Sequence, residues 1–186
     1  MTKTLLVLGG ARSGKSAYAE DRAQMHAGEK IYIATAEMID AEMAERVRQH
    51  QGRRGQDWRT VEAPLALPKA LRQHDAPGKV VLIDCVTVWI GNRVLRGDTD
   101  EAILAGADEL AALVPRCGFD VTLVSNEVGE GVHPETAIGV RFRDLLGITN
   151  QRLAAACEHV VLMVAGLPLT IKAPEVGSHV RAPEAP

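Results

Sequence analysis

The residues whose types and spacing point most directly to chemistry lie near the start of the chain. They read Gly9-Gly10-Ala11-Arg12-Ser13-Gly14-Lys15-Ser16, and the spacing Gly-x-x-x-x-Gly-Lys-Ser is that of the phosphate-binding P-loop. Glycines at the two fixed positions permit backbone angles that turn successive N–H groups towards phosphate oxygens. In such loops the lysine contacts the β- and γ-phosphates and the serine ligates Mg²⁺. The segment therefore predicts nucleotide binding, with Lys15 acting on the phosphates and Ser16 on the metal.

A carboxylate that could complete the magnesium site follows a later apolar run. Asp84 comes directly after Val80-Val81-Leu82-Ile83, where a Walker B aspartate is expected, at the carboxyl end of a buried strand and beside the P-loop. An aspartate after a strand is also a common turn or cap residue. The sequence therefore leaves two interpretations of Asp84, a magnesium ligand and a turn residue.

A histidine at the end of a predicted helix is a candidate nucleophile. Helical spacing over residues 37–50 places four side chains on one stripe: Ile39, Met43, Val47 and His50. A basic turn, Gln51-Gly52-Arg53-Arg54, follows and suits phosphate or carboxylate. A neutral imidazole beside such a turn could attack an α-phosphate and form a covalent nucleotidyl intermediate. Spacing alone favours the ordinary alternative, a helix cap or half-buried packing residue.

The elements that must position these residues alternate along the chain. Apolar, β-rich runs predict strands at 4–8, 30–34, 80–84, 121–125 and 159–165, and a further strand is expected at 58–62, after the basic turn. Helical periodicity predicts helices at 16–27, 37–50, 65–74, 100–115 and 136–157. This alternation indicates an α/β fold, a single-domain P-loop NTPase-like unit over 1–165 with a mostly parallel sheet and helices on both faces. Residues 166–186 hold four prolines and are predicted to be a C-terminal tail or an arm on a neighbouring subunit.

Composition excludes several classes of protein. A chain of 186 residues with 46% apolar and 3% aromatic residues suits one domain with an aliphatic core. Its net charge of −3 provides no overall basic field, so we expect no nucleic-acid partner. Three widely spaced cysteines predict neither disulfides nor a zinc site, and the first apolar run is too short to enter a membrane. We therefore expect a cytoplasmic protein without membrane insertion.

With these pieces placed, the chain resembles the bifunctional adenosylcobinamide kinase / adenosylcobinamide-phosphate guanylyltransferase family of cobalamin biosynthesis. The resemblance covers nearly the whole chain, because several separate blocks occur in the family's order. The blocks are Gly9–Ser16, Tyr32–Ala36, Asp40–Met43 with Arg46 and His50, Trp58–Glu62, Ile83–Thr87, Ser125–Gly131, Phe142–Asp144 and Asn150–Ala154.

The resemblance implies two reactions on one fold. The first phosphorylates the aminopropanol hydroxyl of adenosylcobinamide with ATP, GTP or both. The second transfers GMP from GTP to adenosylcobinamide phosphate through a guanylylated histidine, which maps onto His50, and gives adenosylcobinamide-GDP. The resemblance also implies a homotrimer with nucleotide sites near the subunit boundaries. The family's nucleotide contacts map onto Gly9–Ser16, Ala34, Thr35, Ala36, Gln51, Gly52, Arg53, Arg54, Glu62 and Asp84.

Some roles stay open at this stage. Asn126 and Glu127 follow a predicted strand, so they are candidate corrinoid or ribose contacts, or a capped turn before the next helix. Their block is not the Asn-Lys-x-Asp motif that reads guanine in GTPases, so base choice must rest on other contacts. Arg12 and one of Arg53 and Arg54 are candidates for stabilising a leaving pyrophosphate.

Two other functions are compatible with the P-loop itself, which many unrelated activities share. One is a kinase for another small molecule in which His50 is structural. The other is a nucleotide-dependent switch or binding subunit with slow turnover. A covalent GMP on His50 would separate the bifunctional enzyme from both alternatives.

Overall fold

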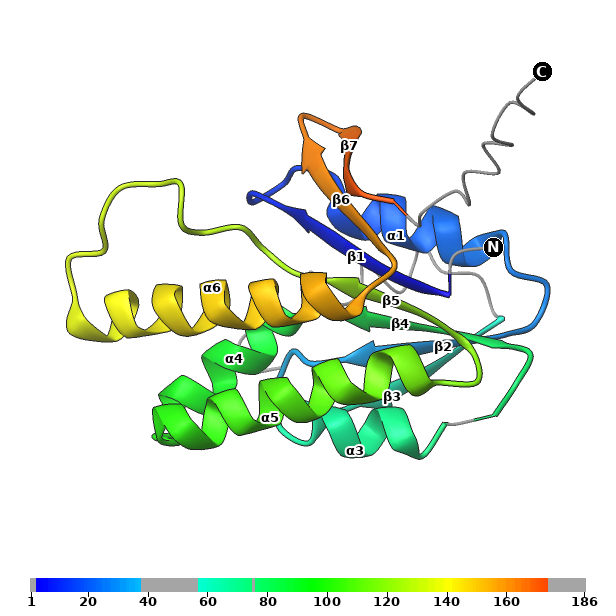
Figure 1. Ribbon diagram of the computed structural model, residues 1–186, viewed down its shortest axis with the longest axis horizontal. Coiled ribbons are helices and arrows are strands. Elements are labelled where there is room, and N and C mark those ends of the chain that lie inside the picture. The colour runs from blue at the N-terminus through cyan, green and yellow to red at the C-terminus, as the bar shows by residue number, and fades with distance from the viewer. Residues whose placement is uncertain (1–2, 38–56, 75, 174–186) are drawn as a thin grey trace, which may run out of the picture.

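A seven-stranded sheet forms the centre of the molecule in the computed structural model, which describes residues 3–37, 57–74 and 76–173 (Figure 1). The strand order is β3-β2-β4-β5-β1-β6-β7. All neighbours pair in parallel except the last two, which form an antiparallel hairpin. The strands are β1 (Thr4–Gly9), β2 (Glu29–Ala34), β3 (Trp58–Glu62), β4 (Lys79–Asp84), β5 (Asp120–Val124), β6 (His159–Val164) and β7 (Leu167–Lys172).

Helices cover both faces of the sheet, as the α/β prediction requires (Figure 1). Helix α1 (Lys15–Gln24) packs on one face, against β1, β4 and β5. The other face carries α3 (Leu67–Arg72), α4 (Val86–Leu95), α5 (Asp100–Leu113) with a short 3₁₀ turn, η1 (Val114–Arg116), and α6 (Ala137–Ala156). The described part of the chain contains no helix that is long and apolar enough to cross a membrane.

The two cores follow from the alternation of side chains along each strand. On β1, Leu6 points into the core beneath α3 to α6, whereas Leu5 and Val7 point into the core beneath α1. Strands that are buried on both faces must be apolar at nearly every position. This is why the strand segments appear in the sequence as continuous runs of Val, Leu and Ile.

The expected elements are confirmed within the described residues, with strand ends within one residue and helix ends within three. Residues 38–50 of the expected helix lie outside the described residues. The sequence does not predict α4, because the helix begins with Val86-Thr87-Val88-Trp89-Ile90, residues that favour strands more than helices, directly after β4. It also did not predict β7. Residues 167–172, expected as part of a tail or arm, form an exposed edge strand of the sheet.

A close backbone contact between the turns before β2 and β4 provides a test of this fold. A Cβ at Gly28 would lie 1.8 Å from the carbonyl oxygen of Gly78, whereas a Cβ at Gly147 in α6 would have no neighbour within 4 Å. Gly28→Ala should therefore lower the free energy of unfolding by about 2 kcal/mol or more. Gly147→Ala should raise it by about 0.5–1 kcal/mol, since alanine favours helix. Urea denaturation of both variants checks this, and equal effects would contradict the packing described.

Candidate active site

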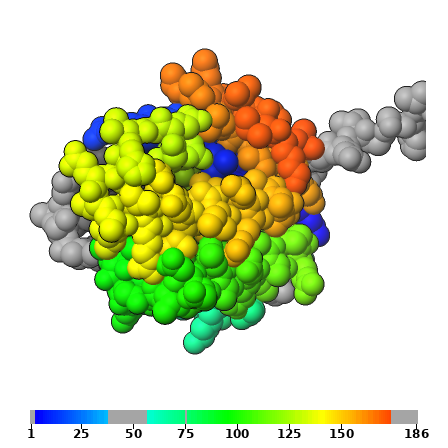
Figure 2. Space-filling view, turned by 60° about the vertical axis from the view of Figure 1, so that its left-hand side comes forward, coloured from blue at the N-terminus to red at the C-terminus, as the bar shows by residue number. Residues whose placement is uncertain are grey.

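The carboxyl ends of the parallel strands meet at one edge of the sheet, and the predicted site residues follow them. The P-loop leaves β1, Thr35 and Ala36 follow β2, Glu62 ends β3, and Asp84 ends β4. In Figure 2, which brings this edge forward, blue atoms from the start of the chain lie in a hollow between the yellow-green segment before α6 and the orange β6–β7 hairpin. Open α/β sheets bind their ligands at such an edge.

The P-loop has the backbone conformation that its sequence predicts. Gly9 and Gly14 have φ angles of 147° and 98°, and Arg12 also has a positive φ of 56°. Gly14 is the N-cap of α1, so the loop runs directly into the positive end of that helix. Glycine is required at the first position, because a Cβ there would lie 2.6 Å from the carbonyl oxygen of Met163. The loop can therefore surround an anion with main-chain N–H groups.

The β6–β7 hairpin holds the P-loop from the outside. The main-chain N–H of Gly166, at the hairpin turn, donates a hydrogen bond of 3.0 Å to the carbonyl oxygen of Ser13. The hydroxyl of Ser13 is buried and has no hydrogen-bond partner among the described residues. Buried hydroxyls are normally hydrogen-bonded. A ligand oxygen in the loop would supply the missing partner, which fits a phosphate site.

Lys15 is a buried cation at the start of α1. Its side chain is 7% exposed, and its Nζ donates a hydrogen bond of 2.6 Å to the carbonyl oxygen of Gly10. Burial lowers the pKa of Lys15 below the ordinary lysine value, while negative charge on Cys85 and Asp84 opposes that shift. Burial also raises the pKa of the Cys85 thiol to about 12. A bound phosphate would place further negative charge beside this buried ammonium.

Asp84 lies on the same face of the sheet as α1. The hydroxyl of Tyr32 donates a hydrogen bond of 3.1 Å to its Oδ2 atom, and Tyr32 packs in the core beneath α1. Strand β5 lies between β4 and β1, so Asp84 approaches the P-loop from the second strand along. The charge of Asp84 still acts on Lys15.

Helix α4 ties together the ends of β2, β3 and β4. Thr35 Oγ1 donates to the carbonyl oxygen of Cys85 at 2.7 Å and accepts from its N–H at 2.9 Å. The Asn92 amide donates to the carbonyl oxygens of Thr35 and Pro64 at 2.8 and 3.1 Å. Trp89 Nε1 donates to the Leu65 carbonyl oxygen at 2.8 Å. These bonds fix the segments that follow β2 and β3.

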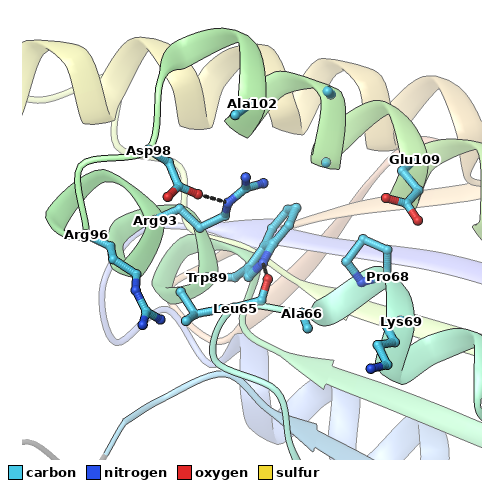
Figure 3. A pocket seen from close by; sticks show the side chains of 12 residues that line it. Leu65, Ala66, Pro68, Lys69, Trp89, Arg93, Arg96, Asp98, Ala102 and Glu109 are labelled. Carbon is cyan, nitrogen blue, oxygen red and sulfur yellow. Dashed lines mark hydrogen bonds and ion pairs between the residues drawn. The ribbon is translucent and has the colours of Figure 1, made fainter.

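Trp89 also lines a separate cavity of about 570 Å³ between α3, α4 and α5 (Figure 3). Arg93 lies over its ring, 5.6 Å from the centroid, and pairs with Asp98 at 2.7 Å. The cavity belongs to the helical layer, and no P-loop residue lines it. Its contacts explain how α4 is held, not how phosphate is bound.

The predicted nucleotide contacts fall into separate groups. Residues 9–16 begin at the end of β1, whereas Asp84 ends β4, two strands away, and pairs with Ala34, the last residue of β2. Thr35 and Ala36 follow β2, and Glu62 ends β3. Strand β2 is three strand spacings from β1, and β3 is four. Across the sheet these separations are about 14 and 19 Å. A ligand touching both groups must extend across the sheet. His50 and residues 51–54 lie outside the described residues.

Sequence reasoning missed several polar residues that support this edge. Tyr32, Thr87 and Asn150 were quoted only within longer blocks, yet each hydrogen-bonds to a residue at the end of a strand. Gly166 was assigned to a tail, yet it contacts the P-loop. One sequence signal could have identified these side chains: a hydroxyl or amide within an otherwise apolar element. Such a group is expected to be buried, and buried polar groups require hydrogen-bond partners.

Comparison with known proteins gives consistent results. A family model described as cobinamide kinase / cobinamide phosphate guanyltransferase matches residues 5–171. The chain is 41% identical over 184 residues to "Bifunctional adenosylcobalamin biosynthesis protein CobU" of Escherichia coli (strain K12), covering 90% of this chain and 99% of the relative. It is 42% identical over 173 residues to the corresponding CobP protein of Pseudomonas aeruginosa, covering 90% of this chain and 96% of the relative.

Solved structures of low sequence identity share the fold. A Pyrococcus horikoshii OT3 protein studied as project PH0250 matches with a TM-score of 0.57 and 8% identity, covering 92% of this chain and 86% of that chain. An ATPase from the type III secretion system of pathogenic bacteria matches with a TM-score of 0.54 and 12% identity, covering 90% and 56%. At these identities the matches support the fold alone.

The two adjacent glycines that open the P-loop provide a matched test of the site. A Cβ at Gly9 would meet the Met163 carbonyl oxygen and the Ser13 hydroxyl within 2.7 Å, whereas a Cβ at Gly10 would meet nothing within 4 Å. Gly9→Ala should therefore weaken GTP binding by about a hundredfold or more, because the loop cannot keep its conformation. Gly10→Ala should change the Kd by less than about threefold. Titration with a fluorescent GTP analogue measures both, and similar losses would argue against this loop geometry.

Proposed function

The chain belongs to the cobinamide kinase / cobinamide phosphate guanyltransferase family, and from this we propose that it catalyses both reactions. It phosphorylates adenosylcobinamide with ATP or GTP, and then transfers GMP from GTP to adenosylcobinamide phosphate to give adenosylcobinamide-GDP. The observation that carries the proposal is the family match over residues 5–171. The P-loop, Lys15 and Asp84 at one edge of the sheet support it.

In the kinase step, the protein's own groups hold the triphosphate. The main-chain N–H groups of residues 9–16 and the Lys15 ammonium bind the β- and γ-phosphates. The aminopropanol hydroxyl attacks the γ-phosphorus, the bond from that phosphorus to the β-phosphate oxygen breaks, and the hydroxyl proton is lost. Positioning and charge neutralisation provide most of the rate acceleration in such transfers.

Ser16 and Asp84 are suited to hold Mg²⁺. Both provide oxygen ligands, which Mg²⁺ prefers, and the Tyr32 hydrogen bond orients the Asp84 carboxylate. Within the described residues there is no cluster of three or more His, Cys, Asp or Glu that could enclose a metal. This fits an ion that takes its other ligands from phosphates and water. When bound, Mg²⁺ would neutralise charge on the phosphate oxygens.

In the guanylyl step, His50 acts as the nucleophile. Its unprotonated imidazole nitrogen attacks the α-phosphorus of GTP, a P–N bond forms, and pyrophosphate leaves. A phosphate oxygen of adenosylcobinamide phosphate then displaces the histidine. Arg12, which is exposed in the P-loop, and Arg53 or Arg54 stabilise the leaving pyrophosphate. Gln51, Gly52, Ala34, Thr35, Ala36 and Glu62 contact the nucleotide, as the family resemblance implies.

The β6–β7 hairpin is the surface through which we expect the subunits of a homotrimer to meet. Val164, Leu167, Leu169 and Ile171 are 54–72% exposed in one hairpin, and exposed apolar patches commonly mark protein interfaces. Among the described strands, none pairs with the outer edge of β7, and the main-chain groups of such an edge can pair with another chain. Because Gly166 contacts the P-loop, such an interface would place the nucleotide site near a subunit boundary. The trimer works in the cytoplasm, where its cysteines stay reduced.

Intact-mass measurement after incubation with GTP and Mg²⁺ tests the covalent mechanism. The parent protein should gain the mass of one GMP at neutral or alkaline pH, and the gain should be absent from His50→Ala. His133→Ala is the matched control and should retain the gain, since His133 is an exposed histidine elsewhere in the chain. No gain in the parent, with GTP binding verified, would leave a simple P-loop kinase as the better explanation.

Light scattering coupled to gel filtration tests the subunit interface. Leu169→Asp should convert trimer to monomer at micromolar concentration, because it places a charge in a buried apolar contact. Leu95→Asp makes the same change at a residue that is 75% exposed in α4 and should leave the trimer intact. A trimer that survives Leu169→Asp would show that the hairpin is not the contact.

A further inference from the structure

The end of β5 occupies the position between the two parts of the phosphate site. Strand β5 lies between β4, which carries Asp84, and β1, which carries the P-loop. Residues that follow β5 at the same edge therefore lie between these two groups. Three polar residues follow it in order: Ser125, Asn126 and Glu127.

The pairing between β5 and β1 continues past the formal end of β5. The N–H of Ser125 donates to the Val7 carbonyl oxygen, and the N–H of Glu127 donates to the Gly9 carbonyl oxygen, both at 3.0 Å. Val124 is the partner of Val7 in this ladder, so Asn126 is opposite Gly9, the first P-loop residue. Asn126 therefore lies beside the phosphate loop at the same height along the sheet.

Alternation along the strand places the Asn126 side chain on the phosphate face. Ser125 faces the α4–α6 layer, because its hydroxyl donates to Asn150 Oδ1 at 2.7 Å and lies 3.4 Å from Thr87 Oγ1. The next side chain points to the opposite face, which is that of α1 and Asp84. Asp84 pairs with Val124, so Asn126 is its diagonal neighbour across β4 and β5.

Buried side chains hold the main chain of Asn126 from both sides. Its N–H donates to Thr87 Oγ1 at 2.6 Å, and its carbonyl oxygen accepts from Asn150 Nδ2 at 3.0 Å. Thr87, Ser125 and Asn150 are 8%, 0% and 5% exposed. In contrast, the Asn126 side chain makes no hydrogen bond to the rest of the described chain. The buried network of Thr87, Ser125 and Asn150 thus fixes the main chain of Asn126. The side-chain amide of Asn126 remains available to a ligand.

We propose that the Asn126 carboxamide donates a hydrogen bond to the γ-phosphate of the bound triphosphate. The proposal rests on the proposed kinase function and deepens it, because it assigns a catalytic contact to a residue outside the P-loop. A neutral amide is suited to this role, since its NH₂ group donates hydrogen bonds to phosphate oxygens. Because the amide carries no negative charge, it does not compete with Asp84 for the Lys15 ammonium. A donor aimed at the transferring phosphoryl group stabilises charge that develops in the transition state.

Binding of GTP and GDP by Asn126→Ala tests the contact without any need for catalysis. The variant should bind GTP about ten- to a hundredfold more weakly than the parent, as expected for a lost hydrogen bond to a charged group. Its Kd for GDP should change by less than about threefold, because GDP lacks the γ-phosphate. Val132→Ala, a substitution at a side chain that is 96% exposed in the same loop, should change neither value. Equal losses for GTP and GDP, or no loss for GTP, would overturn the proposal.

Steady-state kinetics of adenosylcobinamide phosphorylation supply the second measurement. Asn126→Ala should lower kcat by about a hundredfold while the KM for adenosylcobinamide stays within about threefold. A raised KM with unchanged kcat would instead make Asn126 a corrinoid contact and reject the phosphate contact. If the parent phosphorylates no adenosylcobinamide, the proposed function fails, whereas the GTP and GDP comparison still decides whether Asn126 reads the γ-phosphate.

Discussion

A buried lysine ammonium at the edge of the sheet is the interaction on which the rest of the site depends. Burying a cation without a partner is costly, and Lys15 is 7% exposed. The Gly10 carbonyl oxygen and the Asp84 carboxylate compensate in part. The Gly10 carbonyl oxygen is near Lys15 because the glycine loop curls over the start of α1, whereas Asp84 approaches from the end of β4. The same curl suits the N–H groups of the loop to anion binding, so one loop conformation serves both the buried lysine and the proposed phosphate site.

A single helix, α4, connects the strand ends on which this arrangement relies. Its first turn carries Thr87, which holds the main chain after β5, and its last turns carry Asn92, which holds Thr35 after β2. Trp89 anchors the segment after β3. Parallel strands have no short connections at their ends, so side-chain bonds must set the relative positions of the loops there. In the proposed site the Walker-type residues bind the phosphates, and the hydrogen bonds from α4 hold the surrounding loops in place.

The sequence allowed correct prediction of the α/β class and of strands β1 to β6. Five of these strands are apolar runs, the composition that buried parallel strands require, whereas β3 is a more polar strand at the edge of the sheet. The sequence did not allow prediction of α4, which begins with a β-branched and aromatic run typical of strands, or of β7, where Pro168 argued against a strand. The order of the strands in the sheet could not be predicted from the sequence either. Whether β4 or β5 is the neighbour of β1 depends on long-range pairing, which local patterns do not encode. The sequence therefore indicated Asp84 as a candidate site residue, but it did not indicate that β5 separates its strand from the P-loop strand.

Strand order also bears on how one site can serve two reactions. The proposed chemistry requires attack at the γ-phosphorus in one step and at the α-phosphorus in the other, with the P-loop binding the phosphates both times. The two nucleophiles must therefore approach different ends of the same triphosphate. Asp84 and Asn126 lie on the β4–β5 side of the P-loop, whereas the hairpin turn at Gly166 closes its other side. Groups that act on the γ-phosphate can thus be fixed to the sheet, which leaves the α-phosphate to be reached by a residue from outside these strands.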